Sequence, residues 1–197
     1  MQNNSRERKS TLRLKDFDYS TDGAYFTTIC TQNREKFFGK IENAKMILNE
    51  YGKITEQCWH NLPNHYANCR LDEFVIMPNH VHGIIWIDNL FKPDLSKPVG
   101  TGLKPVPTSP EPILTPPEPA PTVHDLSEIV RGFKTFSSKE INVAIIEKSA
   151  PLIFRWQRSF YDRIIRDEDE LNKIRDYILL NPTNWMQDKN FCSNVNE

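Results

Sequence analysis

The chain has 197 residues, and its 25 lysines and arginines nearly balance 26 aspartates and glutamates, so its net charge is −1. This length fits one domain with an insertion. The near-zero charge excludes a uniformly basic coat for nucleic acid but leaves room for a local basic face. No apolar run approaches the about 20 residues of a membrane span, and the polar N-terminal segment lacks the core of a secretion signal. The four cysteines form no CxxC pair, which predicts reduced thiols and no zinc site. We therefore expect a cytoplasmic protein.

Prolines are concentrated in one segment of the chain. Ten of the 14 lie between Pro93 and Pro121, without hydrophobic periodicity. This composition is typical of extended polyproline-like or disordered chain, and a loop of such length argues against one uninterrupted compact domain. The predicted organisation is a basic flexible arm at 1–15, one domain at 16–186 interrupted by a Pro-rich insertion at 91–123, and a flexible tail at 187–197.

The first half of the chain predicts a strand followed by a helix. Residues 24–31 are rich in aromatic and β-branched side chains, which favours a strand. Residues 37–41 fit a second short strand or a turn. From Asn43, a possible cap, apolar residues recur every three or four positions as far as residue 62, which predicts an amphipathic helix ending near Pro63.

The second part predicts a strand pair, a helix, a strand and a last helix. Two apolar runs, 70–77 and 80–87, flank a Pro-Asn pair and fit adjacent strands, while the helical period returns at Leu126. Residues 161–166 fit a strand. Asp167 with Glu170 has the spacing of a capping box that opens the last helix. This order predicts an α+β fold, in which helices pack on one mainly antiparallel sheet.

A His-Val-His sequence lies inside the second of these paired strands. Side chains at positions i and i+2 of a strand point to the same face, about 6–7 Å apart, so the rings of His80 and His82 can converge on one metal ion. Two histidines leave such an ion open positions, as a catalytic site needs. The alternative is that both are structural residues on a half-exposed face.

The last helix carries a second candidate pair. Tyr177 and Asn181 are four residues apart and therefore share one helix face. The amide of Asn181 can offer an oxygen ligand to a hard cation, and the Tyr177 hydroxyl would then lie beside that cation as a nucleophile toward a phosphate. The alternative is that Tyr177 is a packing residue near a helix end.

Four segments of the chain carry motifs in a fixed order: 22–34, 74–85 (FVIMPNHVHGII), 156–166 (WQRSFYDRIIR) and 176–182 (DYILLNP). Together they resemble HUH single-tyrosine transposases, with 74–85 similar to the HUH strand and 176–182 similar to the tyrosine helix. The nearest branch is the REP-associated tyrosine transposases, relatives of small single-strand insertion-sequence enzymes. The resemblance covers about residues 15–90 and 125–186.

This resemblance implies a ferredoxin-like or RRM-like antiparallel sheet. It implies that His80, His82 and Asn181 bind Mg²⁺ or Mn²⁺ and that Tyr177 is the nucleophile. The implied partner is single-stranded DNA with hairpin (REP-like) elements, cut and rejoined through a 5′-phosphotyrosine link in the bacterial cytoplasm near the nucleoid. Related insertion-sequence enzymes carry Gln where this chain has Asn181. The shorter Asn side chain reduces the reach of the amide.

A basic, aromatic stretch around Tyr161 suits binding of DNA phosphates and bases. The expected DNA-binding residues are Arg131, Lys134, Arg155, Trp156, Arg158, Arg163 and Arg166. The alternative is a solvated face whose arginines pair with nearby acids. Tyr161 is also the rival nucleophile, but Tyr177 is preferred because it has an amide four residues later.

Two other functions remain open from the sequence. One is a non-catalytic, RRM-like nucleic-acid-binding module. The other is a metal-dependent nuclease that uses water, with Tyr177 structural. The sequence leaves open whether the protein is a monomer or a homodimer, and no membrane partner is expected.

Overall fold

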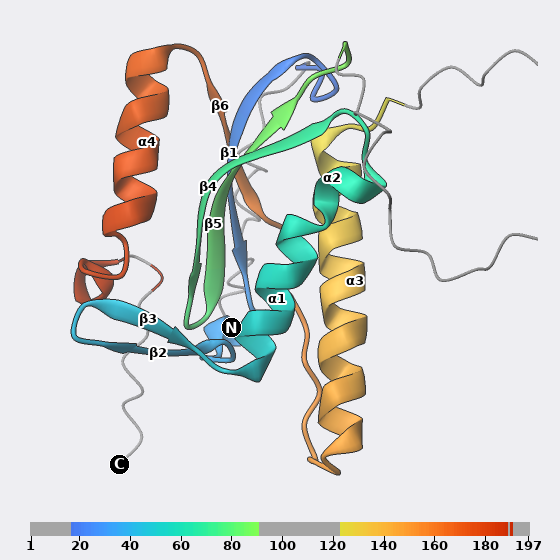
Figure 1. Ribbon diagram of the computed structural model, residues 1–197, viewed down its shortest axis with the longest axis vertical. Helices are drawn as coiled ribbons and strands as arrows, with labels where there is room; N and C mark the ends of the chain where they lie inside the picture. The colour runs from blue at the N-terminus through green and yellow to red at the C-terminus, as the bar shows by residue number, and fades with distance from the viewer. Residues whose placement is uncertain (1–16, 91–122, 189, 191–197) are drawn as a thin grey trace, which may run out of the picture.

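Four strands form one antiparallel sheet in the computed structural model, which describes residues 17–90, 123–188 and 190. The strands are β1 (Gly23–Cys30), β4 (Cys69–Met77), β5 (His80–Ile87) and β6 (Tyr161–Ile165). Their order in the sheet is β4-β5-β1-β6, so β5 and β1 are central and β6 is an edge (Figure 1). All three neighbouring pairs are antiparallel. The predicted α+β fold is confirmed, and the strand order is that of a ferredoxin-like fold.

Helices cover both faces of this sheet. Helices α1 (Glu50–His60) and α3 (Leu126–Glu147) lie on one face, with the short α2 (Leu62–His65) beside them, and α4 (Glu168–Leu180) lies on the other (Figure 1). Each face has its own apolar cluster: the larger one joins the sheet to α1 and α3, and the smaller one joins it to Leu171, Ile174 and Ile178 of α4. None of the helices among the described residues is long and apolar enough to cross a membrane.

Strand β5 divides its side chains between these two clusters. Val81 and Ile85 belong to the larger cluster, whereas Ile84 belongs to the cluster under α4. Because strand side chains alternate, His80 and His82 share the α4 face with Ile84. Gly83 points the other way, where an added Cβ would lie 2.3 Å from the indole of Trp59. The Trp59 ring therefore fills the space that a side chain at position 83 would need.

The predicted helix after Asn43 is wrong in its first turn. Residues 45–48 instead form β3 (Lys45–Leu48), which pairs with β2 (Gly39–Glu42) as a separate hairpin. Asn43 and Ala44 make the turn with φ of 51° and 60°, the sign that a tight two-residue hairpin requires. The helix cap is Asn49, whose side chain accepts the N–H of Gly52 at 2.9 Å. The helical spacing of apolar residues therefore begins within the hairpin, several residues before the helix itself starts at Glu50.

The start of α4 has the predicted cap at Asp167, whose side chain accepts the backbone N–H of Glu170 at 2.7 Å. The returning bond differs from a capping box, because the Glu170 carboxylate accepts the N–H of Arg166, one residue before the cap, at 3.0 Å. The helix ends at Leu180, just before Pro182, which lacks the N–H that a further helical turn would use. The local sequence therefore defines both ends of the helix that carries Tyr177.

One ion pair joins α4 to the edge strand β4. Arg175 donates two hydrogen bonds to the Asp72 carboxylate, from Nε at 2.8 Å and from Nη2 at 2.6 Å. Asp72 lies at a β-bulge, where the β4–β5 register shifts, and also accepts the indole N–H of Trp86 at 3.0 Å. The hydrogen bonds from Arg175 are the main cause that lowers the pKa of Asp72 to about 2.

We predict that Asp72→Asn destabilises the protein by about 1–2 kcal/mol at pH 7, a fall in Tm of about 2–8 °C. A carboxylate with a lowered pKa stabilises the fold above its unfolded pKa, near 3.9, and this contribution is lost as the pH falls toward 2. The Tm difference between wild type and Asp72→Asn should therefore shrink in acid. Thermal melts across this pH range measure it, with exposed Asp176→Asn as the matched control. Equal melting temperatures at pH 7 would contradict an anchoring role.

Candidate active site

Two buried histidines lie side by side beneath α4. The rings of His80 and His82 are fully buried, and their centroids are 4.4 Å apart. A polar neighbour orients each ring: Nδ1 of His82 lies 2.8 Å from the Thr28 hydroxyl, and Nδ1 of His80 lies 2.8 Å from the Asn79 side-chain oxygen. Such partners on the second ring nitrogen are typical of metal-binding histidines. The structure therefore brings the two together as the strand period predicts.

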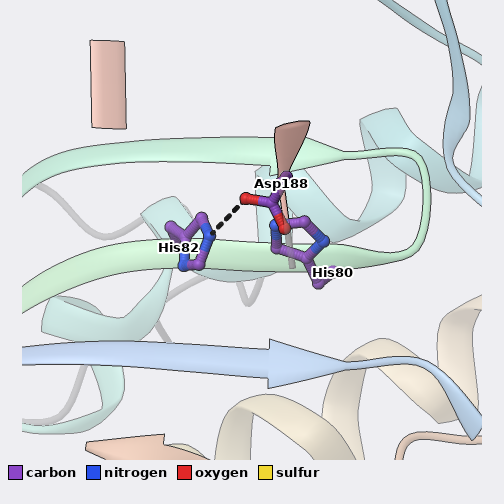
Figure 2. Close-up of side chains that lie close together, drawn as sticks. All are labelled: His80, His82 and Asp188. Carbon is purple, nitrogen blue, oxygen red and sulfur yellow. Dashed lines mark ion pairs between the residues drawn. The ribbon is translucent and has the colours of Figure 1, made fainter. Parts of the chain in front are cut away.

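Asp188 completes a group that could hold a metal ion. The ligand atoms of His80, His82 and Asp188 all lie within 4.8 Å of one another, and Figure 2 shows the carboxylate directed at both rings. Its Oδ2 atom is 3.9 Å from Nε2 of His82, and Oδ1 accepts the backbone N–H of Asn190. Asp188 belongs to the segment 187–197, for which the sequence predicts only a flexible tail, so the sequence prediction of the site lacks this residue. No periodicity or motif around position 188 signals its role, because only tertiary structure brings it to the histidines.

Neighbouring groups stabilise the negative charge of Asp188 in spite of its burial. Its side chain is only 3% exposed, and burial by itself would raise the pKa. The neighbouring His82, the N–H of Asn190 and the nearby His80 outweigh that effect and hold the pKa of Asp188 below its ordinary value. The carboxylate is therefore ionised at neutral pH and can act as an anionic ligand.

Tyr177 reaches this group from α4. Its hydroxyl lies 3.2 Å from Nε2 of His82 and donates to Oδ2 of Asp188, also at 3.2 Å. The ring stands edge-on to Phe26, with centroids 6.0 Å apart, and remains 41% exposed. Burial of the hydroxyl, followed by the negative charge of Asp188, raises the pKa of Tyr177 to about 12. The phenol is therefore neutral at physiological pH, with its oxygen at the candidate metal group.

Asn181 lies one turn after Tyr177 and is 2% exposed. Its amide nitrogen donates to Oδ2 of Asp188 at 3.2 Å. Its oxygen is buried and has no hydrogen-bond partner among the described residues, although buried acceptors normally find one. Two imidazoles, one carboxylate and an unsatisfied amide oxygen fit a divalent cation: the oxygen donors suit Mg²⁺ or Mn²⁺, and the imidazoles add nitrogen ligands.

A cleft of about 1020 Å³ opens beside Tyr177. It lies against β6 and α4, and both Tyr177 and Tyr161 line it. Tyr161 pairs with Thr28 of β1, which in turn pairs with His82 of β5, so one strand separates Tyr161 from the histidines. The two candidate tyrosines therefore share a cleft, and the hydroxyl of Tyr177 contacts His82 and Asp188.

The expected DNA-binding residues fall into two separate places. Arg163 and Arg166 line the cleft beside Tyr177. A second groove, of about 670 Å³, is lined by α3 and by the segment before β6. The expected DNA-binding residues in this second groove are Arg131, Lys134, Arg155, Trp156 and Arg158.

Two of these residues have internal roles in the structure. Trp156 is a core residue, only 9% exposed, and its indole N–H donates to Ser137 at 2.9 Å. Its ring is therefore largely buried, although the sequence predicts contacts with DNA bases at this position. The Lys134 ammonium donates to the carbonyl oxygens of residues 157, 158 and 159 at 3.0–3.3 Å. Burial lowers the pKa of Lys134 to about 8. Its donors hold this loop in place.

The chain is similar to known proteins in sequence and in fold, although no family model matches it. A protein of Haemophilus influenzae described as uncharacterized is 36% identical over 181 residues, which cover 92% of each chain. The chain belongs to the same family as that protein. A REP-associated tyrosine transposase solved bound to a REP hairpin has a similar fold, with a TM-score of 0.53 and 17% identity, over 90% of this chain and 77% of the other. The fold is therefore transposase-like.

We predict that the wild-type protein binds Mn²⁺ and that Asp188→Asn and His82→Ala each weaken this binding by at least about tenfold, since each removes a ligand. The measurement is the rise in Tm on adding Mn²⁺, because a ligand that binds the folded state stabilises it. His65→Ala, at an exposed histidine outside the site, is the matched control. An equal rise in all four proteins would place the ion elsewhere.

Proposed function

We propose that this chain is an HUH-type single-tyrosine endonuclease and strand transferase acting on single-stranded DNA. The observation that carries the proposal is the position of the Tyr177 hydroxyl, 3.2 Å from both His82 Nε2 and Asp188 Oδ2. A nucleophile and a set of candidate metal ligands thus meet at one point, as covalent transfer of a phosphoryl group requires. The transposase-like fold supports the same function.

In this proposal the oxygen of Tyr177 attacks a phosphorus atom of the DNA backbone. A new O–P bond forms, and the bond from phosphorus to the 3′ oxygen breaks. The products are a 5′-phosphotyrosine link and a free 3′ hydroxyl. The phenol loses one proton and the leaving oxygen gains one, so no further reactant is consumed. Because one phosphate ester is exchanged for another, attack by a 3′ hydroxyl on the phosphotyrosine can rejoin strands.

Neighbouring residues orient the groups that take part in this step. Thr28 orients the His82 ring, and a T-shaped contact with Phe26 holds the Tyr177 ring so that its hydroxyl faces the cluster. Mg²⁺ or Mn²⁺ held by His80, His82 and Asp188, with Asn181 as a further donor, would supply positive charge to the scissile phosphate. The ionised carboxylate of Asp188 offers the negative charge that such a cation needs.

The proposed substrate is single-stranded DNA flanked by a hairpin. The neighbour of similar fold was solved with a REP hairpin bound. In this chain Arg131, Arg155 and Arg158 are exposed around the second groove, where they can contact phosphates of a hairpin stem. We do not expect Trp156 and Lys134 to contact the DNA, because their polar groups form hydrogen bonds within the chain.

We predict that Tyr177→Phe abolishes the covalent protein–DNA adduct while DNA affinity changes less than about threefold, because only the attacking oxygen is removed. The measurement is a denaturing gel with labelled single-stranded DNA and Mn²⁺. Tyr161→Phe is the matched control and should keep the adduct. Cleavage without an adduct in wild type would favour a nuclease that uses water, and DNA binding without cleavage would favour a non-catalytic module.

We further predict that DNA affinity falls steeply with salt. Arg155→Gln and Arg158→Gln should each reduce the slope of log K against log salt by about one, because each removes one phosphate contact. The measurement is a salt titration of binding to a DNA hairpin. Lys53→Gln, at an exposed position on α1, serves as the control. An unchanged slope in both arginine variants would exclude the second groove as a phosphate-binding face.

A further inference from the structure

Three aromatic rings line the cleft beside the nucleophile. Phe26 lies between the two tyrosines and meets both edge-on, with centroids 6.0 Å from Tyr177 and 6.5 Å from Tyr161. Both tyrosines also line the cleft of about 1020 Å³. A tyrosine on the sheet surface, half-buried against a second ring, presents a flat apolar face that is held in one orientation.

The register of the sheet sets how far Tyr161 is from the candidate metal group. Tyr161, Thr28 and His82 are directly opposite one another on β6, β1 and β5. Two strand spacings amount to about 10 Å. Tyr161 is therefore too far from His82 to share the contacts of Tyr177, but close enough to meet a base next to a phosphate bound at Tyr177.

Charged side chains around the cleft suit a DNA backbone at this place. Arg166 and Lys173 are exposed and line the cleft, and Arg163 beside them pairs with Glu170. Two of the acids in the cleft wall are engaged in the start of α4: Asp167 accepts the N–H of Glu170, and Glu170 accepts the N–H of Arg166. Cations for DNA phosphates are thus present in the same cleft as the two tyrosines.

We propose that Tyr161 is the stacking platform of a nucleotide subsite next to Tyr177, and that it holds the base adjacent to the scissile phosphate. This inference deepens the proposed function and rests on its single-stranded DNA substrate. It gives Tyr161 a binding role that needs the ring and not the hydroxyl. Stacking of bases on aromatic side chains tolerates any base, so the subsite positions the strand rather than reading its sequence.

The experiment compares a dT oligonucleotide with an oligonucleotide of equal length made of abasic units, in the Tyr177→Phe protein so that nothing is cleaved. We expect the dT strand to bind more tightly, with a ratio of affinities of about tenfold or more from stacking. Tyr161→Phe keeps the ring and should keep this ratio. Tyr161→Leu keeps apolar packing but lacks the ring, and should reduce the ratio several-fold. Tyr51→Leu, on the opposite face of the sheet, is the matched control, and thermal melts establish that each variant is folded.

The outcomes separate this subsite from the proposed function. An unchanged ratio in folded Tyr161→Leu overturns the subsite and leaves the adduct test of Tyr177 standing. Loss of the adduct in Tyr161→Phe, with Tyr177 restored, also overturns it, because Tyr161 would then be the nucleophile. A ring-dependent ratio in a protein that forms no adduct supports the subsite while the proposed enzyme function fails.

Discussion

The site depends on the burial of two imidazoles in the centre of a sheet. His80 and His82 occupy positions of β5 that apolar residues would fill at lower cost, and both are fully buried. Buried polar groups must be hydrogen-bonded to be tolerated, and here the neighbouring strand and turn meet that demand through Thr28 and Asn79. The same bonds fix the direction of each ring. The partners that offset the cost of burial are therefore also the partners that orient both rings on the α4 side of the sheet.

The carboxylate beside the histidines comes from a distant part of the chain. The sheet face under α4 offers no carboxylate of its own beside the histidines. Asp188 reaches them after α4 has ended, and Asn190 closes the connection: its N–H holds Asp188, and its carbonyl oxygen accepts the Asn79 side chain at 2.9 Å. The residue that orients His80 is thus tied to the segment that carries the acid. Displacing residues 188–190 would loosen both a candidate ligand and the orientation of another.

The parts of the site that repeat with a backbone period could be predicted from the sequence. The strand period placed His80 with His82, and the helix period placed Tyr177 with Asn181; the structure brings all four together. Asp188 lies in neither period. Its role depends on where the chain turns after Pro182, which local sequence does not define. The helix predicted for residues 44–48 is wrong for a different reason. Their apolar residues have a helical spacing, but the positive φ of Asn43 and Ala44 turns the chain into a hairpin.

The basic stretch before and within β6 shows a further limit of sequence patterns. Arginines and aromatic residues alternate there as on a nucleic-acid-binding surface, yet the chain crosses from one side of the sheet to the other within this stretch. Arg155 and Arg158 accordingly line one groove, Arg163 lines the other, and Trp156 enters the core.

Two attachments, one before and one after Tyr177 in the sequence, determine where this residue lies. In the middle of α4, Arg175 is bound through two hydrogen bonds to Asp72 on the edge strand β4. Past its end, Asp188 lies against the central strand β5. Tyr177 is between these two attachments, one turn before Asn181, and the apolar contacts of Ile174 and Ile178 hold the helix onto the sheet. A helix attached only at its apolar stripe could slide along the sheet, since apolar contacts are not directional. Directional bonds on either side of Tyr177 restrict that sliding, and the hydroxyl of this half-exposed tyrosine is thereby kept beside the buried His82.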